Sequence, residues 1–305
     1  PDPLACGGKE GPPFAPPKPP PLRPQPPRED PEAHPAGTAP PFARLDLPSK
    51  SDGTFLFAGD VRLPGMVYAA IRHGPVGDAR LTRFDGEAAR SVRDVLSVVR
   101  AKRWLAVVAT NWWAAEQALA AMKPVFEVSG LAESSAIAAA LDDGLRTGAA
   151  TRLHEVGDPE SLLARNFDLV RRYDVAPALH ATPEPASATA RLTDGKLELW
   201  LATQAPEAAR RAAARALGID TAKVVLYPMA AGGSFDRRLE HEHAVEAAII
   251  ARAVGRPVQL MWSRWQEHVA GLPRTPVAAL VGARLGAQGG LVGLRTRLAL
   301  PDTAR

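Results

Sequence analysis

The stretch from Thr203 to Glu267 opens with T-Q-A-P and continues through an alanine- and arginine-rich segment. It then carries the apolar run V-V-L-Y at Val224–Tyr227 and the turn A-A-G-G-S-F-D-R-R at Ala230–Arg238. The apolar spacing predicts a strand, a small-residue turn at Gly232–Ser234 and a helix over Leu239–Val254. Such a turn gathers backbone N–H groups with no side chain in the way, which suits an anionic or oxo-rich ligand. Taken alone, the pattern favours a turn that only satisfies backbone geometry.

Other motifs surround this stretch in a fixed order. Gln204 lies 28 residues before Gly232, with one helix and one strand predicted between them. Upstream stand D-V-R-L-P-G-M at Asp60–Met66 and H-A-T-P-E-P at His180–Pro185; downstream stand E-A-A-I-I-A-R-A-V-G-R-P-V and W-S-R, ending at Arg264. In this order and spacing, over roughly residues 44–297, the motifs resemble the molybdenum-binding subunit of the xanthine dehydrogenase/aldehyde oxidase family of molybdenum hydroxylases. The resemblance is to the branch that includes the beta subunit of isoquinoline 1-oxidoreductase.

The chain divides into three predicted parts, which together make an α+β fold. Residues 1–48 hold 17 of the 30 prolines and should form an extended linker, because such a segment cannot build the interior of a helix or sheet. The resemblance makes residues 49–150 an α/β hammerhead domain and residues 151–305 the first part of a molybdopterin-binding α+β domain. In the family another large molybdopterin-binding domain follows, so we expect a truncated N-terminal fragment.

The resemblance also implies a chemistry. The cofactor would be molybdenum–molybdopterin in its cytosine dinucleotide form, and the substrate an aldehyde or an N-heterocycle that receives water-derived oxygen. Electrons would leave through iron–sulfur clusters held by a small partner subunit. The catalytic base of the family is a glutamate in a late G-x-G-E motif, which this sequence lacks. We therefore expect no catalytic residue in this chain and no activity of the chain alone.

Seven positions match cofactor-binding positions of the family. Gln204 follows an apolar strand, and its amide matches the glutamine that hydrogen-bonds the apical oxygen of molybdenum. Gly232 and Gly233 would let the backbone approach the cofactor, and Phe235 matches a ring that walls the substrate pocket. Without the resemblance, Gln204 reads as an exposed residue at a helix start and Phe235 as part of the core. The seven positions are Gln204, Gly232, Gly233, Ser234, Phe235, Asp236 and Arg237, and no metal ligand from the protein is predicted.

The turn departs from the family at two positions. Ser234 replaces the third family glycine, and Asp236 adds a negative side chain where most relatives have glycine. This carboxylate either turns toward Arg237 or Arg238, or weakens the binding of an anionic cofactor. The two arginines either pair with a phosphate of the cofactor or form a solvated basic pair. A helix start does not itself favour cations, which slightly supports an anionic partner.

Composition argues against several other classes of protein. The net charge is +4 and the pI about 9.5, but the charges are interspersed and form no basic, aromatic-bearing face of a nucleic-acid binder. The single cysteine, Cys6, can form neither an internal disulfide nor an iron–sulfur cluster. No apolar run approaches the ~20 residues of a membrane span. The first residue is proline and not methionine, so the compartment stays undecided.

Short strands and helices are predicted to alternate from Gly53 onward. Asn111 should cap a helix that ends at Met122, and Asp194-Gly195 should make a two-residue hairpin turn. The other predicted helices are Glu87–Val95, Ser134–Leu145 and the alanine-rich segment after T-Q-A-P. The other predicted strands are Thr54–Phe57, Met66–Arg72, Leu81–Phe84, Trp104–Ala109, Asp168–Tyr173, Thr189–Leu192 and Lys196–Leu201, with a hairpin over Pro276–Leu298.

Glu240-His241-Glu242-His243 has the composition of a metal site but not its spacing. On a helix the two histidines point about 200° apart, and the H-E-x-x-H spacing is not met. A solvated helix face is the better interpretation. Of Trp112 and Trp113, one indole should face the core, and the other should be exposed, as at a subunit or domain contact.

His180 and Glu184 lie on a proline-containing loop before a strand. The resemblance places them along the approach to the active site, and a purely structural role in the loop is equally consistent with the sequence.

Two functions remain open at this point. The chain is either a cofactor-binding subunit or a non-catalytic relative that keeps the fold for assembly and binds no cofactor. Asp236 and the missing third glycine favour the second. A nicotinamide dehydrogenase is disfavoured, because no G-x-G-x-x-G follows the first strand. The first function requires Gln204 and the turn at residues 232–234 to converge on one point.

Overall fold

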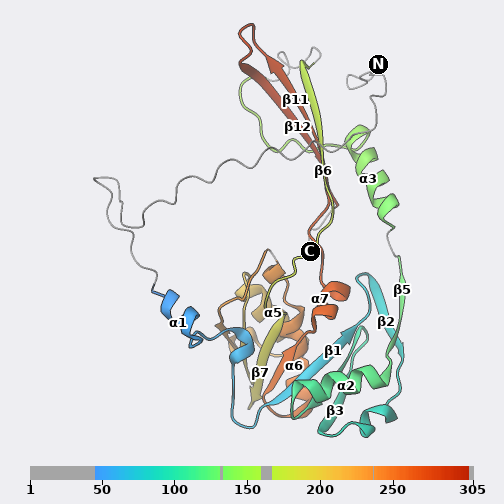
Figure 1. The fold of residues 1–305 in the computed structure, drawn as a ribbon, viewed down its shortest axis with the longest axis vertical. Helices are drawn as coiled ribbons and strands as arrows, with labels where there is room; N and C mark the ends of the chain where they lie inside the picture. The colour runs from blue at the N-terminus through green and yellow to red at the C-terminus, as the bar shows by residue number, and fades with distance from the viewer. Residues whose placement is uncertain (1–44, 131–132, 159–166, 236, 302–305) are drawn as a thin grey trace. The chain divides into compact units, whose positions relative to one another are not determined.

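The computed structural model describes residues 45–130, 133–158, 167–235 and 237–301 (Figure 1). The predicted proline-rich linker therefore lies almost entirely outside the described residues. Among the described residues, those up to Phe55 belong to one compact unit, and those from Leu56 onward belong to a second. In the first unit, the short helix α1 (Leu47–Asp52) ends at Gly53, whose φ of 80° is left-handed, as is common after a helix.

The second unit is a mixed α/β structure. Its helices are α2 (Trp112–Met122), α3 (Ser134–Arg146), α5 (Pro206–Leu217), α6 (Glu242–Val254) and α7 (Arg264–Ala270). Short 3-10 turns are η1 (Ala58–Asp60), η2 (Glu87–Ser91), η3 (Thr221–Lys223) and η4 (Arg237–Leu239). The strands are β1 (Val67–His73), β2 (Asp78–Arg83), β3 (Val95–Arg100), β4 (Trp104–Ala109), β5 (Val125–Ser129), β6 (Leu169–Val175), β7 (Ser187–Thr193), β8 (Lys196–Leu201), β9 (Val224–Pro228), β10 (Val258–Met261), β11 (Val277–Leu285) and β12 (Leu291–Ala299).

The main sheet has seven strands in the order β3-β4-β1-β10-β7-β8-β9. The pairs β1–β10 and β8–β9 are parallel, and the other neighbours are antiparallel. Strands from residues 67–109 and from residues 187–261 thus share one sheet. The domain boundaries at 48 and 150 remain a prediction.

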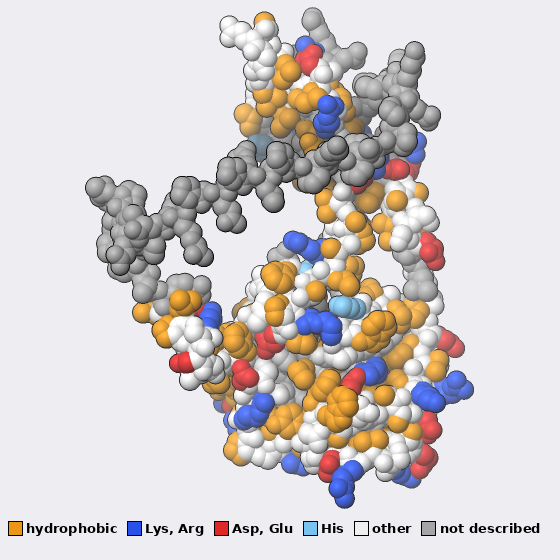
Figure 2. All heavy atoms as spheres, viewed as in Figure 1, with side chains coloured by type: hydrophobic (Ala, Val, Ile, Leu, Met, Phe, Trp, Pro, Cys, Tyr) orange, Lys and Arg blue, Asp and Glu red, His pale blue; other side chains and the backbone are white. Residues whose placement is uncertain are grey.

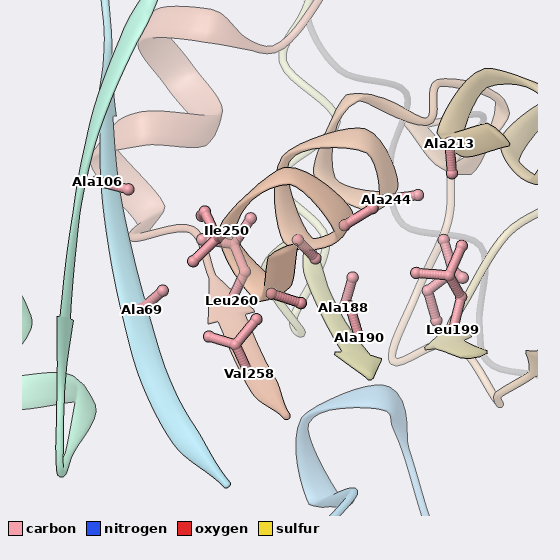
Figure 3. Close-up of a cluster of buried hydrophobic side chains, with 14 of the residues drawn as sticks. Ala69, Ala106, Ala188, Ala190, Leu199, Ala213, Ala244, Ile250, Val258 and Leu260 are labelled. Atoms are coloured by element: carbon pink, nitrogen blue, oxygen red, sulfur yellow. The ribbon is translucent and has the colours of Figure 1, made fainter. Parts of the chain in front are cut away.

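Helices α5 and α6 pack on one face of this sheet, and alanine makes the packing close. Ala213 of α5 and Ala244 of α6 are fully buried. Figure 3 shows Ile250 of α6 next to Leu260 and Val258 of β10, and Ala244 of α6 on the side of Ala188 and Ala190 of β7. Alanine has the highest helix propensity, and its small side chain lets a helix approach a sheet closely. The alanine-rich composition therefore serves both the helices and the core.

Helix α2 packs on the opposite face, against β1 and β4. Its cap is the one predicted, since the side chain of Asn111 accepts a hydrogen bond from the N–H of Ala114 at 2.9 Å. Trp112 donates from Nε1 to the carbonyl of Met261 at 2.9 Å, whereas Trp113 is 66% exposed. The prediction of one indole inside and one outside is confirmed.

The segment between Leu56 and Met66 runs beside β10. Phe57 forms an isolated parallel bridge with Ala230. The side chain of Gln259 donates from Nε2 to the carbonyls of Gly59 at 3.1 Å and Val61 at 3.2 Å. The start of the D-V-R-L-P-G-M region is therefore held next to the glycine turn.

Two smaller sheets, β12-β11-β6 and β2-β5, complete the unit. Helix α3 packs against β11 and β12, and Asp142 of α3 pairs with Arg172 of β6. On the other face of this three-stranded sheet, Tyr173, Val175 and Leu294 are more than half exposed. Figure 2 shows hydrophobic side chains gathered over β11 and β12.

Most predicted elements are present, but three predictions were wrong. Thr54–Phe57 is not a strand, because only Phe57 pairs and η1 begins directly after it. The predicted helix Glu87–Val95 is the 3-10 turn η2, and Val95 already begins β3, where branched residues favour a strand. Helix α6 begins at Glu242, because residues 237–239 form a separate 3-10 turn. Strands β3, β5 and β10 and helix α7 were not predicted.

Candidate functional site

Four of the sequence motifs meet at one edge of the seven-stranded sheet. Strands β8, β9 and β10 run in one direction, and β7 runs against its neighbours β8 and β10. The ends of three strands and the start of the fourth therefore share this edge. T-Q-A-P follows β8, the glycine turn follows β9, Trp262–Arg264 follows β10, and His180–Pro185 precedes β7.

Gln204 and the glycine turn are in direct contact. The hydroxyl of Ser234 donates to Oε1 of Gln204. The backbone N–H of Gln204 donates to the carbonyl of Arg238 at 2.8 Å, and the hydroxyl of Thr203 donates to the same carbonyl at 3.3 Å. The convergence that the resemblance required is therefore present. Gln204 is exposed, and within the described residues no hydrogen-bond partner is found for its side-chain nitrogen.

The two glycines of the turn are needed for packing inside the protein. A Cβ on Gly232 would lie 2.5 Å from Cβ of Glu184, and a Cβ on Gly233 would lie 2.6 Å from Cδ of Pro183. Gly233 also has a φ of 96°, which side chains rarely tolerate. The close approach that sequence analysis assigned to a cofactor is thus made by the loop before β7. Cofactor binding by these glycines remains a prediction.

Glu184 holds the turn from the other side. Its Oε2 accepts from the N–H of Gly232 at 2.8 Å, and its Oε1 accepts from the N–H of Gly59 at 3.0 Å. Its backbone N–H donates to the carbonyl of Gly232 at 2.9 Å. Of the two roles left open for Glu184, the structure supports the structural one. His180 contacts the turn as well, through Nδ1 and the carbonyl of Phe235.

Arg238 is turned into the protein and only 2% exposed. Its Nη2 donates to the carbonyl of Glu184 at 2.7 Å, and its Nε donates to the carbonyl of Gly233 at 3.4 Å. These bonds link the turn to the loop before β7. The alternative that Arg238 belongs to a solvated basic pair is therefore wrong. The predicted site residue Asp236 and the side chain of Arg237 lie outside the described part of the chain.

Phe235 is 56% exposed and has a φ of 48°. The alternative that this ring belongs to the core is therefore wrong. Its role as a wall of a substrate pocket remains a prediction. A positive φ at a phenylalanine marks backbone strain of the kind that accompanies functional turns.

Behind the sheet edge lies a buried polar network that sequence analysis missed. His73 contacts Oε1 of Glu246 through Nε2 at 2.7 Å and Oε1 of Gln266 through Nδ1 at 2.8 Å. Trp262 donates from Nε1 to Oε2 of Glu246 at 2.9 Å, and its ring centroid lies 4.4 Å from that of His73. The network fixes the end of β10 to α6 and β1. The sequence signals were that Glu246 interrupts an apolar helix face and that Glu246 and Trp262 open two of the matched motifs.

The cluster at residues 240–243 is not a solvated helix face throughout. His243 is 1% exposed, because it shares the buried stripe of α6 with Ala247 and Ile250. The interpretation of residues 240–243 as a solvated helix face was therefore wrong for His243. Among the described residues, no three His, Cys, Asp or Glu side chains are arranged to hold a metal ion. No helix of the described part is long and apolar enough to cross a membrane.

Comparisons with known proteins agree with the motifs. The family described as molybdopterin cofactor-binding domain matches residues 145–301. The chain is 31% identical over 256 residues to the beta subunit of isoquinoline 1-oxidoreductase of Brevundimonas diminuta, covering 80% of this chain and 32% of that protein. It is 28% identical over 237 residues to a nicotinate dehydrogenase subunit of Pseudomonas putida, covering 74% of this chain and 20% of that protein. The chain thus spans a third or less of the length of these relatives.

The fold is similar to solved structures. Aldehyde oxidoreductase from Desulfovibrio gigas superposes with a TM-score of 0.66 at 19% identity, over 84% of this chain and 34% of that one. At this identity the likeness concerns the fold alone.

Proposed function

We propose that this chain supplies part of the cofactor-binding site (the cofactor seat) of a molybdenum hydroxylase. The chain belongs to the molybdopterin cofactor-binding family, among the molybdenum-binding subunits of the xanthine dehydrogenase type. The observation that carries this proposal is the contact between Gln204 and the turn at Ser234. These two elements come from strands β8 and β9, and their carboxyl ends open on the same sheet edge.

The donor groups at this edge fit an oxygen-bearing cofactor in one specific way. The Gln204 side chain accepts from Ser234 through Oε1, and none of the described residues accepts from its nitrogen, so its two N–H groups would serve an external acceptor. A primary amide fixed on its oxygen side donates in a defined direction. When bound, a molybdopterin cofactor would supply the redox chemistry. Gln204 would orient it by donating a hydrogen bond to one of its oxygen ligands.

The proposed site residues are those of the family motif. Gly232, Gly233, Ser234 and Phe235 would border the cofactor, with Asp236 and Arg237 beside it. The N–H of Gly232 already donates to Glu184, so this group would shape the seat and not bind an anion itself. We propose no catalytic residue in this chain, because its sequence contains no G-x-G-E glutamate.

The substrate and the partner follow from the same family. Relatives bear the names isoquinoline 1-oxidoreductase and nicotinate dehydrogenase, which both refer to N-heterocycles. We propose an aldehyde or an N-heterocycle as the substrate, a cytosine dinucleotide form of the cofactor, and a separate small subunit for the iron–sulfur clusters. The single cysteine of this chain supports the last point, since a cluster needs about four thiolates.

The second candidate is a relative that binds no cofactor and serves assembly. Two observations favour it: the Gly232 N–H and the Ser234 hydroxyl are both used within the protein. The replacement of the third glycine by Ser234 and the carboxylate of Asp236 point the same way.

Pterin release distinguishes the two functions. The full chain, purified from cells that make molybdenum cofactor, would be denatured under oxidising conditions and its pterin fluorescence measured. The proposed function predicts about one pterin per chain, whereas a scaffold would release none. Turnover of an aldehyde with a dye by this chain alone would contradict the proposal that the catalytic base is missing.

A further inference from the structure

Both oxygens of the Glu184 carboxylate are used by backbone groups from distant parts of the chain. Oε1 accepts from the N–H of Gly59, 125 residues upstream, and Oε2 accepts from the N–H of Gly232, 48 residues downstream. Hydrogen bonds to an ionised acceptor are shorter and stronger than neutral ones. One side chain thereby joins the segment before β1 to the glycine turn after β9.

The backbone of Glu184 is tied to the same turn. Its N–H donates to the carbonyl of Gly232 at 2.9 Å. Its carbonyl accepts from Nη2 of Arg238 at 2.7 Å and from the hydroxyl of Thr182 at 2.8 Å. Because Cβ of Glu184 lies only 2.5 Å from the place that a Cβ of Gly232 would take, the two residues pack with no room for a side chain between them. The backbone from which the carboxylate extends is therefore fixed next to the turn.

These contacts close a ring that includes Gln204. The carbonyl of Glu184 binds Arg238, the carbonyl of Arg238 accepts from Gln204, and the side chain of Gln204 accepts from Ser234. The turn then returns to Glu184 through Gly232. A change at Glu184 therefore reaches the amide of Gln204 through hydrogen bonds on both sides of the turn.

We propose that Glu184 is a positioning residue for the cofactor seat: its carboxylate fixes the glycine turn against Gly59 and thereby sets where the Gln204 amide points. The role of Glu184 toward a cofactor rests on the proposed function, whereas the fixing of the turn by its carboxylate does not depend on that function. Glu184 touches no reacting atom in this account.

The test compares Glu184→Gln with a matched control, Glu198→Gln. Glu198 accepts from Arg191 and from the hydroxyl of Tyr227 on β9, so the control also removes one charge that has two partners. A carboxamide at 184 keeps one acceptor oxygen and cannot serve both N–H groups. Hydrogen–deuterium exchange of the full chain should be about tenfold faster in at least one of the segments 57–61 and 230–235. The control should leave both segments unchanged.

The hydrogen–deuterium exchange measurement alone tests whether Glu184 fixes the turn. Rates within twofold of the wild type in both segments, with Glu184→Ala giving the same result, would overturn the proposal. If the thermal midpoint shows that Glu184→Gln is unfolded, hydrogen–deuterium exchange is measured on Glu184→Asp in place of Glu184→Gln. Aspartate keeps the charge but is one methylene shorter, so it should also loosen at least one segment.

A second measurement separates positioning from mere stability. In protein loaded with cofactor and reduced with dithionite, the Mo(V) electron paramagnetic resonance signal of Glu184→Gln should differ from the wild-type signal, while the Glu198→Gln signal should not. An unchanged signal alongside faster exchange would overturn the positioning of Gln204. If wild-type protein takes up no molybdenum, the proposed function fails, and the exchange result still decides the fixing of the turn.

Discussion

The hydroxyl of Ser234 donates to the side-chain oxygen of Gln204, although 30 residues separate them in the sequence. The backbone N–H of Gln204 is held by the same segment, through the carbonyl of Arg238 at 2.8 Å. The glutamine is thus fixed at its backbone and at one end of its side chain. Its orientation is set before any ligand arrives, which is what a directional donor at a binding site requires.

Replacing Ser234 with alanine tests the bond that orients Gln204. The change should lower the free energy of unfolding by roughly 0.5–1 kcal/mol, at the low end for a hydrogen bond because Ser234 is partly exposed. Urea unfolding at constant pH measures it, with Ser97→Ala in β3 as the control. A loss above about 2 kcal/mol would mean that Ser234 contributes more than this bond.

Replacing Gly232 with alanine tests the packing of the turn. The added Cβ would meet Cβ of Glu184 at 2.5 Å, so the loop or the turn must move. We expect a loss of roughly 1–3 kcal/mol of unfolding free energy, as for other overpacked sites. Gly290→Ala is the matched control, since a Cβ there meets no atom within 4 Å. Equal stability of the two variants would contradict the described packing.

Replacing Glu246 with alanine tests the buried network. Glu246 is 4% exposed, and its removal takes away the hydrogen bonds that it makes with Nε2 of His73 and Nε1 of Trp262. We expect a loss of about 3 kcal/mol or more, because two hydrogen bonds to a buried carboxylate are lost together. Thermal unfolding followed by circular dichroism measures it. The exposed Glu127→Ala should change the midpoint little, and a similar small change for Glu246→Ala would refute the network.

Acidification tests the ion pair at the start of α5. The hydrogen bond from Arg210 holds the pKa of Glu207 below its ordinary value of 4.5. A carboxyl with a lowered folded pKa stabilises the fold above its unfolded pKa, and this contribution is lost as the pH falls through the folded pKa. Glu207→Gln should therefore differ from wild type in unfolding free energy at pH 7 and converge with it as the pH falls from the ordinary pKa of 4.5 through the lower folded pKa of Glu207. A difference that grows on acidification would contradict this assignment.

Sequence motifs were sufficient to predict that Gln204 meets the turn. The motif carries the residue types and their spacing, and strand–turn–helix patterns around it placed both elements at strand ends. The core of β4, β8 and α5 was predictable for the same reason, since apolar runs and alanine-rich helices have clear periods.

The role of Glu184 was not predictable from sequence. Its two carboxylate partners are backbone groups 125 and 48 residues away, and backbone groups leave no signature in the amino-acid pattern. The prediction for His243 was wrong for a related reason. Its three polar neighbours suggested that it faces solvent, whereas its place on the buried face of α6 depends on where the helix begins. Local patterns do not show which side of a helix the sheet will cover.

Molybdenum retention tests the central claim most directly. Wild type, Gln204→Ala and the control Gln117→Ala, which lies exposed on α2, would be purified from cells that make molybdenum cofactor, and metal per chain measured after gel filtration. We expect about one molybdenum per chain in the wild type and the control, and a several-fold lower content in Gln204→Ala. Metal-free wild type, or equal retention in all three proteins, would contradict the account.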